Sequence, residues 1–140
     1  MTSIDFYTHV PDPLGVAARL VAKAWSQHGG VRVLTHDEHD TAALDRLLWV
    51  QPATGFLPHC RLASPLAGET PIIVDHAREH EGAAAVLINL SLTPAPFFSR
   101  FERLAEIVSD DEACVQAGRE RFRFYRERGY ELRVHNLAST

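Results

Sequence analysis

Histidine and carboxylate side chains gather in one short segment, His36–Asp40, whose sequence is His-Asp-Glu-His-Asp. Imidazole and carboxylate groups together suit several divalent cations, so a small metal-dependent hydrolase is one function that fits this segment. However, consecutive residues at a helix start point in different directions, and no distant HExxH or paired-carboxylate motif completes a ligand set. Asp37 or Asp40 has another role available, as N-cap of the following helix. We expect no metal or cofactor, and the hydrolase remains the alternative.

Two other kinds of catalytic feature, a cysteine–histidine pair and a glycine-containing nucleotide or nucleophile motif, have little support in this sequence. His59 lies beside Cys60, but a catalytic histidine and cysteine meet through the fold rather than along the chain. We therefore expect Cys60 to be a small buried side chain. The segment Thr8–Gly15, where the first strand leads into a helix, has neither GxGxxG nor GxxxxGK[ST], and the chain has no GxSxG. The usual phosphate cradle is missing, and catalysis is poorly supported.

The most informative pattern is a basic, aromatic helix near the end of the chain, over residues 117–128. Five of the fourteen basic residues lie within these positions, with aromatic residues among them. At about 100° per residue, one side of such a helix carries four of its residues with Val115 beside them: Arg119, Phe122, Arg123 and Arg126. The opposite side is expected to face the core through Ala117 and Phe124, flanked by Cys114 and Tyr125.

This helix is open to more than one interpretation. Phe122 between guanidinium groups suits an acidic peptide, because arginines bind carboxylates while the ring packs on an apolar side chain. A solvated arginine face, with Arg128 favourable to the helix dipole, explains the same pattern. Direct binding to nucleic acid is opposed by the net charge of -4, since outside Arg119–Arg133 eight basic residues face fifteen acidic ones. The pattern alone leaves docking site and solvated face equally open.

The elements that position these residues alternate between strand and helix, which is typical of an open α/β layer fold. Periodicity and strand-forming residues predict strands over 3–8, 31–35, 71–74, 84–90 and 130–135. Helices are predicted over 14–25, from Asp37 or Asp40 to Trp49, over 97–108, and from Asp110 or Asp111 to Gly129. The first strand, helix and second strand form a βαβ unit, so a mostly parallel sheet is expected.

Length and composition are those of one ordinary globular domain over residues 1–140, with 46% hydrophobic residues. Cys60 and Cys114 lie far apart and form no CxxC pattern, so a reducing, cytoplasmic location is expected. The first residues have neither a basic start nor an apolar run, so we expect no signal peptide. No run of apolar residues approaches the length needed to span a membrane, and no membrane contact is expected.

Two aromatic residues stand in an unusual place. Trp49 ends a predicted helix, and Phe56 lies in the Pro- and Gly-containing loop just beyond it. Both rings can fold back onto the sheet. Aromatic side chains gathered in an irregular segment are also typical of protein interfaces, and the sequence does not separate these two possibilities.

Taken in order, these segments resemble the chi subunit of the bacterial DNA polymerase III holoenzyme. The resemblance spans essentially the whole chain, and two motifs carry it most specifically: LDxxLWxxPxxxFxPH over Leu44–His59 and RxRxxxYRxxGY over Arg119–Tyr130. It implies a Rossmann-like α/β fold without a nucleotide site. It also implies an accessory protein of the clamp-loader assembly, a non-catalytic subunit of a DNA-directed DNA polymerase.

The resemblance further implies two partners. One is the acidic C-terminal tail of single-stranded DNA-binding protein, through which the chain would contact DNA only indirectly. The residues matching the tail-binding region are Arg119, Phe122, Arg126, Val108, Val115 and Gly129. Val115 stands where some relatives carry a lysine, so the site has one fewer positive charge or uses Arg123 instead. The other partner is the psi subunit, whose contacting aromatic residues match Trp49 and Phe56.

Overall fold

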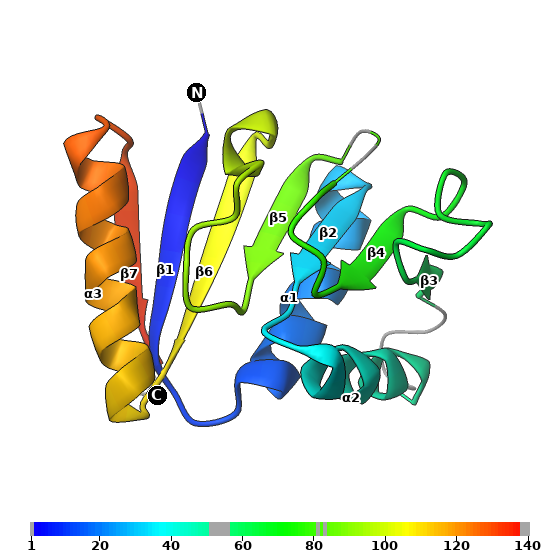
Figure 1. The fold of residues 1–140 in the computed structure, drawn as a ribbon, viewed down its shortest axis with the longest axis horizontal. Coiled ribbons are helices and arrows are strands. Elements are labelled where there is room, and N and C mark those ends of the chain that lie inside the picture. The colour runs from blue at the N-terminus through cyan, green and yellow to red at the C-terminus, as the bar shows by residue number, and fades with distance from the viewer. Residues whose placement is uncertain (1, 51–56, 81, 83, 138–140) are drawn as a thin grey trace.

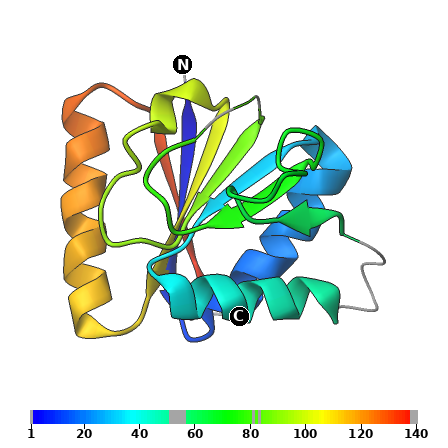
Figure 2. The same ribbon diagram turned by 45° about the vertical axis from the view of Figure 1, so that its right-hand side comes forward.

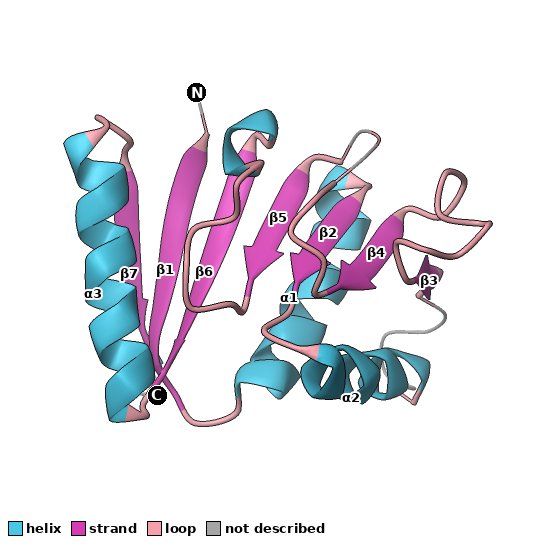
Figure 3. Ribbon diagram, in the orientation of Figure 1, coloured by secondary structure: helices cyan, strands magenta, loops and turns pink. Residues whose placement is uncertain are grey.

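The fold is built on a single parallel sheet, seen in a computed structural model that describes residues 2–50, 57–80, 82 and 84–137. The strands are β1 (Ser3–Val10), β2 (Val31–Leu34), β3 (His59–Cys60), β4 (Ile72–Asp75), β5 (Val86–Asn89), β6 (Arg103–Ser109) and β7 (Leu132–Asn136). Their order is β3-β4-β2-β5-β6-β1-β7, and every neighbouring pair is parallel. The strand arrowheads in Figure 3 accordingly point to one edge of the sheet. The expected open, parallel α/β sheet is confirmed.

Three α-helices in the described part of the chain flank this sheet: α1 (Pro13–His28), α2 (Glu38–Trp49) and α3 (Glu112–Glu127). Each begins at an aspartate whose carboxylate accepts a backbone N–H in the first turn: Asp12, Asp37 and Asp111. Asp37 and Asp111 are thus the caps between which the sequence left a choice. Within the described residues no helix has the length and apolar character needed to cross a bilayer.

The helices cover opposite faces of the sheet (Figures 1 and 2), with α1 and α2 on one side and α3 on the other. Strand side chains alternate between the two cores, as the pleat requires. Val33 and Ile88 pack with α1 and α2 in one hydrophobic cluster. Leu34, Leu87 and Tyr125 belong to the cluster on the face that α3 covers. The sheet therefore has two separate cores, and α3 lies over only one of them.

The prediction of a helix over residues 97–108 is wrong. A short 3₁₀ helix (η2, Phe98–Arg100) is followed by β6, which lies between β5 and β1. Leu104, Ile107 and Val108 are spaced as on one face of a helix, which produced the error. A strand buried on both faces shows a nearly continuous apolar run, and periodicity does not distinguish that run from a buried helix. The two-residue strand β3 was also not expected.

Candidate functional site

The side of α3 that faces the sheet is only partly the expected one: Tyr125, expected beside the core stripe, is buried, but the centre of the stripe lies elsewhere. Its buried residues are Gly118, Arg121 and Tyr125, whereas Ala117 and Phe124 are only half-buried. The side chain of Arg121 is only 2% exposed, and its burial was not expected from the sequence. The core-facing side of the helix therefore includes an arginine. Its burial is compensated because the guanidinium of Arg121 contacts a buried carboxylate.

That carboxylate belongs to Glu106 on β6, which is fully buried. Arg121 donates from Nε to Glu106 at 2.8 Å and from Nη1 to the Leu92 carbonyl at 3.0 Å. Asn89 donates from Nδ2 to Glu106 at 3.1 Å, and the Tyr125 hydroxyl donates to its other oxygen. Burial raises the pKa of Glu106, against the opposing effect of Arg121 and the hydrogen bonds. These contacts join β5, β6 and α3 at fixed positions.

Gly118 allows α3 to approach the sheet closely beside this network. A Cβ atom built on Gly118 would lie 2.9 Å from both methyl groups of Val108 on β6. Nearly every side chain here would force the helix away from the strand. This close approach brings the next residue of the helix, Arg119, to the edge of the sheet.

A groove of about 210 Å³ lies between the first half of α3 and the ends of three strands. Its lining is largely apolar and comprises Phe6, Thr8 and His9 of β1, Val108 of β6, Val134 of β7, and Val115, Gly118, Arg119 and Phe122 of α3. Arg119 and His9 are the ionisable side chains among these described residues, and none of them is a carboxylate. A groove of this composition suits a ligand with an apolar side chain and a negative charge.

Phe122 forms one wall of the groove and is itself held in place. Its ring packs edge-on against Phe6, with 5.3 Å between the ring centroids. The guanidinium of Arg126 lies 5.8 Å from the centroid of the same ring. Phe122 is thus half-buried rather than solvated, and its remaining exposed part faces the groove together with the exposed Arg119.

The structure brings together most residues that the resemblance assigned to tail binding. Val108, Val115, Arg119 and Phe122 line one groove, although their role there stays a prediction. Arg126 lies one turn further along α3 and reaches the groove only through Phe122. Gly129, with a φ of 84°, follows the C-cap of α3 and does not line the groove. Arg123 is exposed and does not line it either.

Sequence reasoning missed five residues of the groove: Phe6, Thr8, His9, Gly118 and Val134. Two signals were available for some of them. Phe6 and Thr8 alternate along the first strand and so share a face, and a glycine inside a helix often marks a close approach of backbone. No comparable signal pointed to His9 or Val134.

The aromatic pair proposed to bind a second partner is only partly described. Trp49, the last residue of α2, is 60% exposed, and its ring lies 4.8 Å from the ring of His59 on β3. The neighbouring Val50 is 61% exposed. Phe56 lies outside the described residues. Trp49 thus contacts the edge strand β3 and is largely exposed, and its role in binding a partner stays a prediction.

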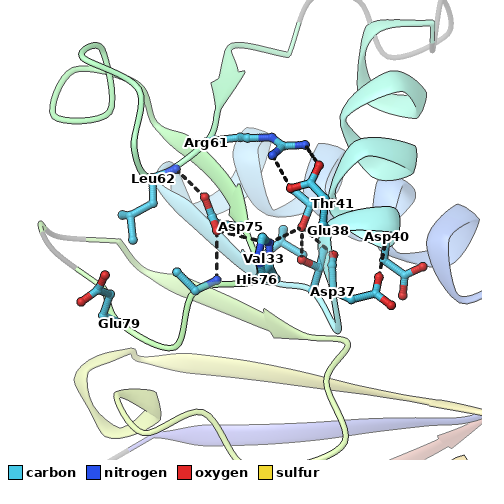
Figure 4. A network of polar contacts seen from close by, with 12 residues as sticks. Val33, Asp37, Glu38, Asp40, Thr41, Arg61, Leu62, Asp75, His76 and Glu79 are labelled. Atoms are coloured by element: carbon cyan, nitrogen blue, oxygen red, sulfur yellow. Dashed lines mark hydrogen bonds and ion pairs between the residues drawn. The ribbon is translucent and has the colours of Figure 1, made fainter.

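Two of the three acidic side chains of the His36–Asp40 segment, those of Asp37 and Glu38, have structural partners (Figure 4). Asp37 caps α2, and Glu38 accepts two hydrogen bonds of 2.6 Å from Arg61. Burial of nearby Asp75 raises its pKa, but the amides of Ala77 and Leu62 together with the charge of Arg32 lower that pKa overall. Among the described residues, no three histidine, cysteine, aspartate or glutamate side chains are placed to hold a metal ion.

The second pair, His59 and Cys60, is also without catalytic geometry in the residues described. His59 is buried, with Nδ1 2.6 Å from the Leu57 carbonyl and Nε2 3.2 Å from Asp45. Both ring nitrogens thus have local partners. Cys60 is half-buried, rather than fully buried as expected.

A cleft of about 400 Å³ lies at the carboxyl ends of the strands, where open α/β sheets commonly bind ligands. Three of its lining residues are aspartates, Asp12, Asp40 and Asp111. Asp12 and Asp111 cap α1 and α3 and so occupy amides that a phosphate would need. These carboxylates oppose an anionic ligand, so the groove beside α3 is the better candidate site.

Comparison with known proteins gives a consistent result. Residues 1–133 match the family model described as DNA polymerase III chi subunit, HolC. The chain is 42% identical to the DNA polymerase III subunit chi of Pseudomonas aeruginosa over 144 aligned positions, which cover 98% of each chain. It is 26% identical to the subunit chi of Escherichia coli, covering 84% of this chain and 80% of that one. The subunit chi of Haemophilus influenzae is 25% identical, with 87% and 85% covered. The chain therefore belongs to the DNA polymerase III chi subunit family.

Proposed function

We propose that this chi-family protein is a non-catalytic adaptor that binds the acidic C-terminal tail of single-stranded DNA-binding protein. The groove beside α3 is the proposed tail site. The observation that carries the proposal is its composition: apolar walls with Arg119 at the rim and no carboxylate among the described lining residues. The clamp-loader assembly would be coupled through the groove to protein-coated DNA, in the cytoplasm, with no direct contact to DNA.

Each part of such a tail has a counterpart in the groove. The terminal carboxylate would accept hydrogen bonds from the Arg119 guanidinium, which binds carboxylates in a planar, bidentate way. The apolar side chains next to it would pack on Phe122, Val115 and Val108. Acidic residues further along the tail would lie in the field of the arginines on the exposed side of α3, such as Arg123 and Arg126.

Replacing Arg119 with alanine is expected to weaken binding of a synthetic tail peptide by about tenfold, or about 1.4 kcal/mol. The effect is moderate because Arg119 is exposed, and water screens its contact with the carboxylate. Calorimetric titration at low salt measures it, and wild-type affinity should fall as salt is added. Arg123→Ala is the matched control, since Arg123 lies on the same helix outside the groove. Equal affinities of wild type and Arg119→Ala would refute the tail site.

The second proposed partner is the psi subunit, with Trp49 as an anchor. Trp49 lies beside β3, at the opposite end of the strand order from β7 and the groove. The two proposed partners would therefore bind to separate ends of the sheet and could bind together.

Trp49→Ala is expected to weaken binding of the psi subunit by about 2 kcal/mol, because exposed tryptophans that become buried in interfaces are frequent hot spots. The measurement is a titration with purified psi subunit from the same organism. Val134→Ala at the other end of the sheet should leave psi affinity unchanged. A Trp49→Ala variant that binds psi as tightly as wild type would exclude Trp49 as an anchor.

A further inference from the structure

His9 is a residue of the groove that neither the sequence nor the family comparison pointed to. It is exposed and lies at the end of β1, and with Arg119 it makes up the ionisable side chains of the described groove lining. The position of His9 follows from an irregularity in the backbone of β1.

The strand β1 contains a bulge at this point. Against β6, Tyr7 pairs with Ile107 while Val10 pairs with Ser109, so β1 advances by one residue more than its partner. Within the bulge His9 has a φ of 57°, and it is the non-glycine residue with positive φ in the described part of the chain. Such a conformation is unfavourable for a residue with a Cβ atom and persists where the surroundings impose it. Bulges often turn a side chain toward a functional site.

The bulge places two consecutive residues on the groove. In an unbroken strand Thr8 would share its face with Phe6, and His9 would share the other face with Tyr7. Instead, both Thr8 and His9 line the groove with Phe6. His9 Nδ1 lies 3.2 Å from the Thr8 hydroxyl, so the ring lies beside Thr8 rather than with Tyr7.

We infer that His9 is a second anchor for the acidic peptide and makes peptide binding stronger at mildly acidic pH. The inference rests on the proposed function of the groove. Val115 leaves the first turn of α3 without a basic side chain, and His9 supplies a cation from the opposite wall when its imidazole is protonated. Histidine is the side chain that changes charge nearest to neutral pH, and bound carboxylates favour its charged form.

The groups that face His9 are consistent with this role. Arg119 is the ionisable residue that α3 contributes to the described lining of the groove. The strands β6 and β7 contribute the neutral Val108 and Val134. His135 of β7 contacts Asp5 at 2.9 Å and stacks on Tyr7, so it is engaged elsewhere. No carboxylate among the described lining residues competes for a protonated His9. The peptide would supply the negative charge.

The test compares the affinity of the synthetic tail peptide at pH 6 and pH 8, at low salt, for wild type and His9→Asn. Asparagine tolerates the left-handed backbone conformation, keeps a smaller polar side chain and cannot become protonated. Wild type is expected to bind about threefold more tightly at the lower pH, the size of an exposed ion pair. The peptide's carboxylates are ionised at both pH values and do not contribute. His9→Asn should abolish the difference and retain the affinity measured at pH 8.

Two further variants separate this inference from the proposed function. His39→Ala removes an exposed histidine outside the groove and should keep the wild-type ratio. Arg119→Ala should weaken binding at both pH values and keep the ratio. If His9→Asn keeps the wild-type ratio while Arg119→Ala weakens binding, the role of His9 is refuted and the tail site stands. If wild type does not bind the peptide, both are refuted.

Discussion

Glu106→Ala is expected to lower the free energy of unfolding by about 3–5 kcal/mol, a large part of the stability of a domain of this size. The substitution leaves the guanidinium of Arg121 buried without its carboxylate. It also removes the acceptor of the Tyr125 hydroxyl and of the Asn89 amide. Each of these donors then remains in the core with a lost hydrogen bond, and that adds to the cost.

Urea unfolding measures this loss, and a double variant is the informative control. Glu106→Leu combined with Arg121→Met removes both charges and restores an apolar contact between β6 and α3. It should regain the part of that loss that comes from the unpaired charge of Arg121, whereas the Tyr125 hydroxyl and the Asn89 amide still lack the Glu106 acceptor. A loss below about 1 kcal/mol for Glu106→Ala would mean that Arg121 finds water or another partner.

The network also links the stability of the fold to the candidate groove. Arg121 lies between Gly118 and Tyr125 on the buried side of α3, while Arg119 and Phe122 lie at the groove. A helix held by Glu106 in this orientation presents those two residues at a fixed angle. Glu106→Ala protein that remains folded should therefore bind the tail peptide more weakly, although Glu106 does not line the groove.

The alternation of strands and helices could be predicted because each element carries its own local signal. The caps Asp37 and Asp111 and the stop near Gly129 are examples in which residue type follows from backbone geometry. Helices join β1 to β2, β2 to β3 and β6 to β7, and these crossovers account for part of the parallel sheet. The strand β6 could not be separated from a helix, because burial on both faces removes the alternation that identifies a strand.

The sequence pattern predicted the groove side of α3, with Val115, Arg119 and Phe122, but only part of its core side. Apolar periodicity places Ala117 and Phe124 inside, with Cys114 and Tyr125 beside them, and gives no reason to bury an arginine. The true core side is chosen by Glu106, which comes from a different element and provides the partner that allows Arg121 to be buried. His9 was missed for a related reason, since its place depends on a bulge relative to β6. Both depend on contacts between distant segments, which periodicity along one segment does not record.

Arg32→Met is the second substitution with a large expected effect, a loss of about 2–4 kcal/mol of unfolding free energy. Arg32 on β2 is fully buried, and burial lowers its pKa to about 10, so it stays charged at neutral pH. It donates hydrogen bonds to four backbone carbonyls, those of Val33, Asp75, Ala77 and Glu79. Methionine fills much of the same volume but leaves these carbonyls without that donor.

This case differs from the Glu106 pair because no second substitution can remove the partners of Arg32. The carbonyls belong to the backbone, so the cost of leaving them unpaired remains whatever side chain replaces the arginine. The loss should be concentrated in residues 75–79, and amide exchange of Leu62 and Ala77, which donate to Asp75, should speed up most. Arg100→Ala, which removes a single bond to the His80 carbonyl from an exposed side chain, should cost about 1 kcal/mol or less. Equal destabilisation by the two variants would show that the four carbonyls do not depend on Arg32.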